Sequence, residues 1–266
     1  MRVNRDVSCS LVALVAAPAT VELQVAVAAA RADERLTVRL DGREFEPEEL
    51  VGDVGGRIHL VRVPAGRLEV DYACRVPGRQ EPVRPGPLDR VVFLRPSRYA
   101  ESDRLAALAQ AELGGLTEPA DLVRAAAAWV GSRLSYVPGS SVGTDGAVDS
   151  LLAGAGVCRD YAHLLVALLR ARDVPARVVS AYAPGLSPMD FHAVVEALVD
   201  DAWCVVDATL LAPRSSLVRI ATGRDTADTA WLASYGGDVQ LAALTVTAVV
   251  DGELPADDLD QVVHLG

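Results

Sequence analysis

The first third of the chain alternates between hydrophobic and polar positions, which is the period of β-strands. Four segments carry this alternation: Thr20–Ala28, Glu34–Leu40, Arg57–Val63 and Arg67–Tyr72. Asp41-Gly42 is a strong turn signal, and Pro64-Ala65-Gly66 separates the last two segments. The pattern predicts an antiparallel, β-sandwich-like domain over residues 1–95.

After the proline- and glycine-rich stretch Pro77–Pro87, the spacing of apolar residues becomes helical and later returns to that of strands. The spacing predicts helices over 102–113, 119–134, 145–152 and 158–172. It predicts strands over 176–182, 191–199, 203–207 and 241–250. Helices followed by antiparallel strands are typical of an α+β fold, so we expect an α+β catalytic domain over residues 96–266.

The charge of the chain argues against two classes of partner. Its 25 basic and 36 acidic residues give a formal net charge of −11, and every basic residue is arginine. An acidic chain has no general attraction to nucleic acid or to anionic lipid, so we predict neither as a partner. The absence of lysine excludes a Schiff base and a phosphate loop of the Walker type.

The N-terminus and the cysteines indicate in which cellular compartment the protein is expected. The apolar run Leu11–Ala17, which follows Arg2 and Arg5, is similar to a signal peptide, but Asp6 interrupts the basic start and strand-like alternation follows. The four cysteines are scattered and form no C-x-x-C pair, which favours a reducing compartment. We therefore expect a cytoplasmic protein without a segment that spans a bilayer.

Cys158 stands where the predicted helix 158–172 begins, after Gly154-Ala-Gly-Val157. A helix N-terminus carries a partial positive charge and free N–H groups, which stabilise a thiolate. The same N–H groups can bind the oxyanion of a tetrahedral intermediate. Cys158 is therefore the candidate nucleophile.

His192 and Asp207 lie on the strands predicted over 191–199 and 203–207, and Asp200-Asp201-Ala202 forms a tight hairpin between them. Antiparallel pairing through so short a turn brings the imidazole and the carboxylate close together. A thiol, an imidazole that takes its proton and a carboxylate that orients the imidazole form the arrangement of nucleophilic catalysis.

Several ordered motifs carry a resemblance to the bacterial transglutaminase-like superfamily, in particular to its actinobacterial two-domain members. They are Gly156–His163, Val174–Arg177, Asp190–Ala193 and Val206–Thr209, with Leu94–Arg104 and Val218–Asp225 in support. The resemblance implies a papain-like core with Cys158, His192 and Asp207 as its catalytic triad. Family members often have aromatic residues where this chain has Val195, Leu198 and Val206, so the resemblance implies no particular substrate pocket.

Three further residues have open or subordinate roles. Tyr136 either places its hydroxyl near the oxyanion or packs in the interior. His163 and Cys158 could form half of a zinc site, but no second pair completes a ligand set, so we predict neither a metal nor a cofactor. Cys204 alternates with its neighbours on the strand and is expected to lie in the core.

Three functions fit these observations. The first is acyl transfer through a thioester, with hydrolysis or transamidation of a peptide or glutamine-type amide. The second is off-loading of an acyl-thioester from a carrier protein, as in Dieckmann-type cyclases, which the arginine-rich stretch Arg75–Arg104 would suit as a docking patch. The third is a non-catalytic binding protein that retains the fold, which an intact triad disfavours. The expected partner is thus a peptide, a protein or an acyl-thioester.

Overall fold

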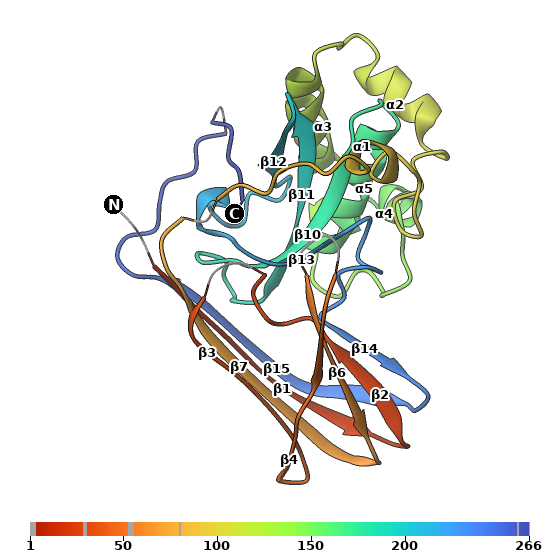
Figure 1. Ribbon diagram of the computed structural model, residues 1–266. Coiled ribbons are helices and arrows are strands. Elements are labelled where there is room, and N and C mark those ends of the chain that lie inside the picture. The colour runs from red at the N-terminus through yellow and green to blue at the C-terminus, as the bar shows by residue number, and fades with distance from the viewer. Residues whose placement is uncertain (1–3, 29–30, 53–55, 80, 260, 266) are drawn as a thin grey trace.

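The computed structural model describes residues 4–28, 31–52, 56–79, 81–259 and 261–265. In Figure 1 a β-sandwich forms the lower part of the molecule, and a mixed region of helices and strands lies above it. Among the described residues, no helix is both long and apolar enough to cross a lipid bilayer.

The sandwich is made of two antiparallel sheets. The first has the strand order β15-β1-β7-β3-β4, with the bounds Val239–Val250, Arg5–Val15, Gly66–Val76, Ala32–Leu40 and Arg43–Phe45. The second has the order β14-β2-β6-β5, with the bounds Leu232–Tyr235, Ala19–Leu23, Arg57–Val63 and Glu48–Val51. In β1 every second residue is buried, from Arg5 to Val15, because one face of the strand packs between the sheets.

The C-terminal strands return to the sandwich. β15 pairs with β1 from Val250↔Arg5 to Val239↔Val15, with a bulge at Val12/Ala13, and β14 pairs with β2. Both strands belong to residues 96–266 in the predicted division, and both pair with strands of residues 1–95. Strand pairing over such a separation leaves no local sequence signal, because any apolar alternating segment can fill an edge position. The division near residue 95 stays a prediction.

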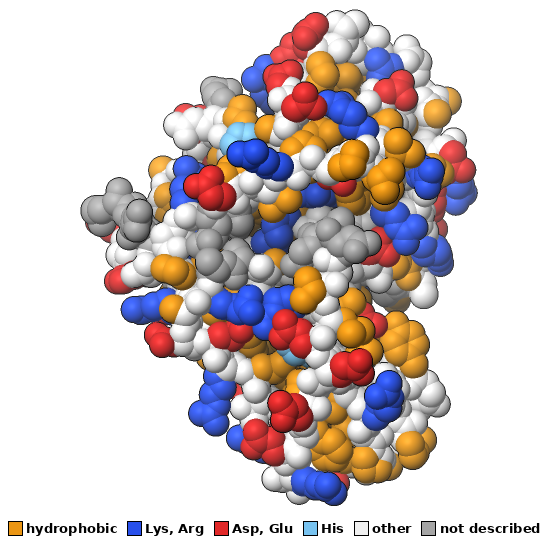
Figure 2. Space-filling view, viewed as in Figure 1, with side chains coloured by type: hydrophobic (Ala, Val, Ile, Leu, Met, Phe, Trp, Pro, Cys, Tyr) orange, Lys and Arg blue, Asp and Glu red, His pale blue; other side chains and the backbone are white. Residues whose placement is uncertain are grey.

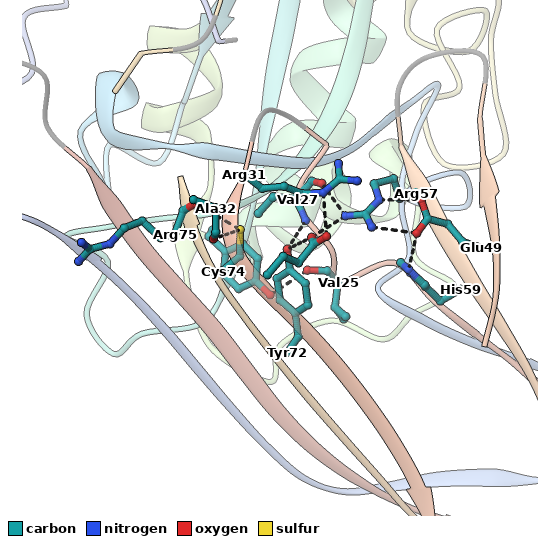
Figure 3. A network of polar contacts seen from close by, with 12 residues as sticks. Val25, Val27, Arg31, Ala32, Glu49, Arg57, His59, Tyr72, Cys74 and Arg75 are labelled. Carbon is teal, nitrogen blue, oxygen red and sulfur yellow. Dashed lines mark hydrogen bonds and ion pairs between the residues drawn. The ribbon is translucent and has the colours of Figure 1, made fainter. Parts of the chain in front are cut away.

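A polar network joins the end of the sandwich to the segment that faces the upper region (Figure 3). The Arg57 guanidinium forms ion pairs with Glu34 at 2.6 Å and with Glu49 at 2.9 Å. The Tyr72 hydroxyl donates to Glu34 and accepts the N–H of Val27. Because the buried Val25–Val27 segment packs against Tyr182 and Phe191, the network fixes the surface on which the sheet of the upper region rests.

The sheet of the upper region is antiparallel, with the order β12-β11-β10-β13 and the bounds Ala202–Val206, Phe191–Val199, Ala176–Tyr182 and Val218–Gly223. Four helices lie on one side of it (Figure 1): α2 Ala106–Leu113, α3 Pro119–Arg133, α4 Ala147–Ala153 and α5 Cys158–Arg170. The short helix α1 Asp89–Val92 lies against Trp203 of β12 instead. A 3₁₀ turn spans Arg214–Ser216, and the two-residue strands β8 Ser135–Tyr136 and β9 Ala155–Gly156 pair in parallel. Buried residues of α5 and α3 pack with Ala193, Val195 and Ala197 of β11 in one core.

Limited proteolysis should cut the coil at 81–88, since it has no regular structure to hold it away from a protease. The fragments should nevertheless stay together in native size-exclusion chromatography. The C-terminal fragment keeps β15, which pairs with β1 of the other fragment, and buried residues from both fragments share a core. Fragments that separate without denaturant, or a first cut between residues 145 and 207, would contradict this arrangement.

Candidate active site

Cys158 is the first residue of α5 and is half-buried. Val157 before it is extended, and the fully buried carboxylate of Asp160 accepts the Val157 N–H at 2.7 Å and the Ser141 hydroxyl at 2.5 Å. A carboxylate at this position occupies one N–H group at the helix start and complements the helix dipole. Asp160 therefore fixes the turn that presents the Cys158 thiol, and sequence reasoning assigned no role to its partner Ser141.

His192 and Asp207 are in direct polar contact. The His192 Nε2 atom lies 2.7 Å from the Asp207 Oδ2 atom, and both side chains are buried. Asp200 and Asp201 take the left-handed conformation of a two-residue hairpin turn, and Val195 pairs with Val206. If this register is continued along both strands, Asp207 lies opposite Val194 and therefore diagonal to His192. Long side chains can bridge that diagonal spacing.

Thr209 holds the other oxygen of the carboxylate. Its backbone N–H and its hydroxyl donate to the Asp207 Oδ1 atom at 2.8 and 2.7 Å. These bonds and that of His192 lower the pKa of Asp207 although burial alone would raise it. The Asp-x-Thr spacing of an Asx turn is the sequence signal that could have identified Thr209.

The electrostatics of His192 favour the imidazolium ion. Burial lowers its pKa, but the hydrogen bonds and charges of Asp207 and Cys158 outweigh burial and raise it to about 10. The Nδ1 atom is buried and has no other hydrogen-bond partner among the described residues, so it is the nitrogen left for the Cys158 sulfur. The structure thus brings the three predicted residues into one chain of contacts.

Tyr136 lies at the same site because β8 pairs with β9 directly before the helix. Tyr136 is paired with Gly156, and the Val137 N–H donates to the Gly156 carbonyl. The ring is 41% exposed, and burial followed by the negative charge of a Cys158 thiolate raises the pKa of its hydroxyl to about 12. The hydroxyl also contacts the Cys158 backbone N–H, so it stays protonated beside the helix start at neutral pH.

The other candidates are not brought into the constellation. His163 is fully buried, and its Nε2 atom accepts the backbone N–H of Thr226; burial lowers its pKa to about 4, so the ring is neutral. Among the described residues, no three His, Cys, Asp or Glu side chains are grouped so that they could hold a metal ion. Cys204 is half-buried and lines a cavity, whereas the sequence placed it in the core.

The arginine-rich stretch is partly neutralised. Arg75 is paired with Asp6, Arg90 with Asp201 and Arg104 with Glu101. On the face shown in Figure 2, basic and acidic side chains are interspersed over the whole surface. These pairs weaken the case for a single basic docking patch.

Comparison with known proteins shows to which family the chain is similar. The family model of the transglutaminase-like superfamily matches residues 106–208, which include Cys158, His192 and Asp207. The crystal structure of a protein from Cytophaga hutchinsonii, named "Putative Cysteine Protease", is similar with a TM-score of 0.88 and 30% identity, over 98% of this chain and 96% of that one. The chain belongs to the transglutaminase-like superfamily.

Two further similarities are more limited. The Mycobacterium leprae (strain TN) protein ML0607 is 36% identical over 89 residues, which are 34% of this chain and only 32% of the length of that protein. The periplasmic domain of TgpA from Pseudomonas aeruginosa is 20% identical over 76% of this chain and 90% of its own, with a TM-score of 0.42. The family and the papain-like α+β fold that the sequence predicted are thus confirmed by the family model and the Cytophaga structure.

Cys158 should be the cysteine that iodoacetamide alkylates fastest. It stands at a helix N-terminus beside an imidazolium, whereas burial raises the pKa of Cys9 to about 11 and also raises those of Cys74 and Cys204. Tryptic peptide mapping distinguishes the sites, since Arg159 and Arg177 place Cys158 and Cys204 in separate peptides. Equal or faster labelling of Cys204 or Cys9 would contradict an activated thiolate.

The Asp207 carboxylate should also set the pH at which the His192 ring loses its proton. The raised pKa of His192 means that the stabilisation from its charge is fully present below about 6.5 and is lost as the pH rises through about 10. The lowered pKa of Asp207 means that its contribution is lost as the solution becomes strongly acidic. Asp207→Asn should lower the pKa of the His192 ring, followed by NMR across pH, by at least about one unit. An unchanged pKa would show that Asp207 does not control His192.

Proposed function

We propose that this protein is a cysteine-nucleophile acyl-transfer enzyme that acts on a peptide or glutamine-type amide through a thioester. The observation that carries the proposal is the position of one buried imidazole between the Asp207 carboxylate and the Cys158 thiol. This geometry has the nucleophile, base and orienting group that covalent catalysis requires.

In the proposed reaction the Cys158 thiolate attacks the amide carbonyl carbon, and the carbonyl π electrons move to the oxygen. The oxyanion then returns its electrons, the C–N bond breaks, and the leaving nitrogen takes the proton of the His192 imidazolium. Ammonia or an amine departs, and the acyl group remains on sulfur as a thioester. His192, now neutral, removes a proton from water or from an amine that attacks the thioester, and the Cys158 thiolate is released.

The groups that would stabilise the oxyanion lie beside the sulfur. The Cys158 backbone N–H is at the free end of α5, and the protonated hydroxyl of Tyr136 is next to it. Donors that are fixed before the reaction are effective because they need no reorganisation when the charge forms. Tyr136 would therefore assist the oxyanion, in addition to its ring contact with Tyr161 at 6.0 Å.

The similarity to the Cytophaga protein covers nearly all of both chains. Its name, "Putative Cysteine Protease", therefore supports a peptide or protein as the substrate. The rival hypothesis of a carrier protein that docks on the Arg75–Arg104 stretch receives less support, because three of its arginines already have acidic partners. Val195 and Leu198, whose apolar side chains are compatible with the rival hypothesis, are buried in packed clusters.

The proposed role of Asp207 gives a kinetic test. Asp207→Asn should keep the fold but lower turnover of a glutaminyl peptide, with hydroxylamine as the acceptor, by about a hundred- to ten-thousand-fold. The double variant with Cys158→Ala should turn over no more slowly than Cys158→Ala alone, because the effects of members of one catalytic unit are not additive.

Tyr136→Phe should lower turnover by about tenfold to a thousandfold without changing Cys158 alkylation.

Melting temperature, measured on the same preparations, separates catalysis from stability. If Asp207 merely holds the end of β12, the Asn variant will melt earlier and turn over nearly normally. That result would remove Asp207 from the mechanism and leave a cysteine–histidine pair. A Cys158→Ala protein with wild-type turnover, or intact mass spectra without any acyl-enzyme at Cys158, would refute the proposed function.

A further inference from the structure

A cavity of about 500 Å³ lies between α3 and the C-terminal segment that follows β15. The segment Asp207–Leu210 and the Cys204 side chain form part of its wall, whereas Cys158 does not line it. Its volume is within the range of small-molecule binding sites, which is roughly 300–1,000 Å³. It is therefore large enough for a ligand and distinct from the nucleophile.

One wall is a smooth face of α3. The residues that line the cavity recur at helical spacing and are mostly small: Ala120, Val123, Arg124, Ala127, Ala128 and Gly131. From Ala120 to Gly131 the helix rises by about 16 Å, so the cavity extends along about that length of α3. Such a shape fits an extended chain better than a compact ring system.

The opposite wall is the C-terminal segment, which is anchored away from α3. Arg214 is buried and holds the segment through an ion pair with Asp257 and a bond to the Asp258 carbonyl. Further along, the Val205 N–H donates to the Val263 carbonyl at 2.8 Å. These bonds attach the segment to the edge of β12, and they keep the cavity from closing on α3.

The mouth of the cavity exposes apolar side chains. Leu210, Leu259 and Val262 all line it, with 59, 54 and 67% of each residue exposed. Leu210 takes the left-handed backbone conformation with φ 56°, which costs energy for a leucine and aims its side chain at this rim. A cluster of exposed apolar groups around one opening is typical of a ligand site.

The charges of the lining are already satisfied. Arg124 is paired with Asp121 and Arg214 with Asp257, and none of the lining residues is aromatic. The cavity thus offers no free cation for an anionic headgroup and no ring for stacking. Ligand sites with a mostly apolar lining and a few polar groups bind predominantly apolar molecules. We propose that it binds a linear aliphatic chain, either of a free fatty acid or of an acyl group attached to a peptide.

Cys204 provides a reporter of occupancy that does not depend on catalysis. We expect dodecanoate and N-dodecanoyl-glycylglycine, as probes of the two sources, to slow N-ethylmaleimide modification of Cys204. At a concentration ten times the dissociation constant the rate should fall by about tenfold. Cys158, mapped in its own tryptic peptide, should react at an unchanged rate. Protection by only one probe shows whether the bound aliphatic chain belongs to a free fatty acid or to an acylated peptide. Adamantane-1-carboxylate, a compact ring system, should not protect.

Two variants and a matched control complete the test. Ala127→Phe fills the cavity and Val262→Asp places a charge at its mouth, so each should weaken binding by at least about tenfold. Val51→Asp is the control, because Val51 is 70% exposed, close to the 67% of Val262, and lies in the sandwich. The Val262 variant keeps the test valid if the Ala127 variant does not fold. No protection by either chain, equal protection by the adamantane compound, or equal weakening by Val51→Asp would overturn the proposal.

Discussion

The position of the reactive thiol depends on the burial of α5. Every residue from Asp160 to Arg170 is buried, and the helix packs against α3, α4 and β11. Leu164, Leu165 and Leu168 are almost fully enclosed, and truncation of one such leucine to alanine typically costs about 2–5 kcal/mol. Because the helix cannot shift without disturbing this core, Cys158 is held in a fixed relation to β11, which carries His192. A rigid scaffold of this kind keeps catalytic groups organised before substrate binds.

The β-sandwich supports the same geometry from the other side. Phe191, the neighbour of His192, lies in a core that also contains Val7, Tyr72 and Val25 of the sandwich. Its ring contacts Tyr182 and Trp231 at 5.4 and 5.5 Å. The ion pairs of Arg57 fix the segment beneath these rings (Figure 3). The start of β11 is therefore held between two cores, which gives the N-terminal strands a structural link to the site.

The sequence was most informative where the signal is local. The helical spacing after Pro119 and after Cys158, and the alternation in β10 and β11, predicted these elements to within about two residues because each has one buried face or is buried throughout. The order of Cys158, His192 and Asp207 and the short turn at Asp200-Asp201 were enough to predict that the three residues meet. Arg5–Val15 was harder to interpret, since its apolar run is similar to a leader, yet it forms β1 between β7 and β15. The pairing of β15 and the cavity beside α3 depend on contacts between distant segments, which residue patterns do not specify.

The proposed chemistry depends on His192 being an imidazolium ion held between a carboxylate and a thiolate. Long-range ¹H–¹⁵N NMR of the histidine rings measures this protonation state directly. Both ring nitrogens of His192 should carry protons at neutral pH and lose one only as the pH rises toward about 10, and Cys158→Ala should lower this pKa. A neutral His192 at pH 7, or a ring that titrates near the ordinary value of about 6.5 in the intact protein, would contradict the claim.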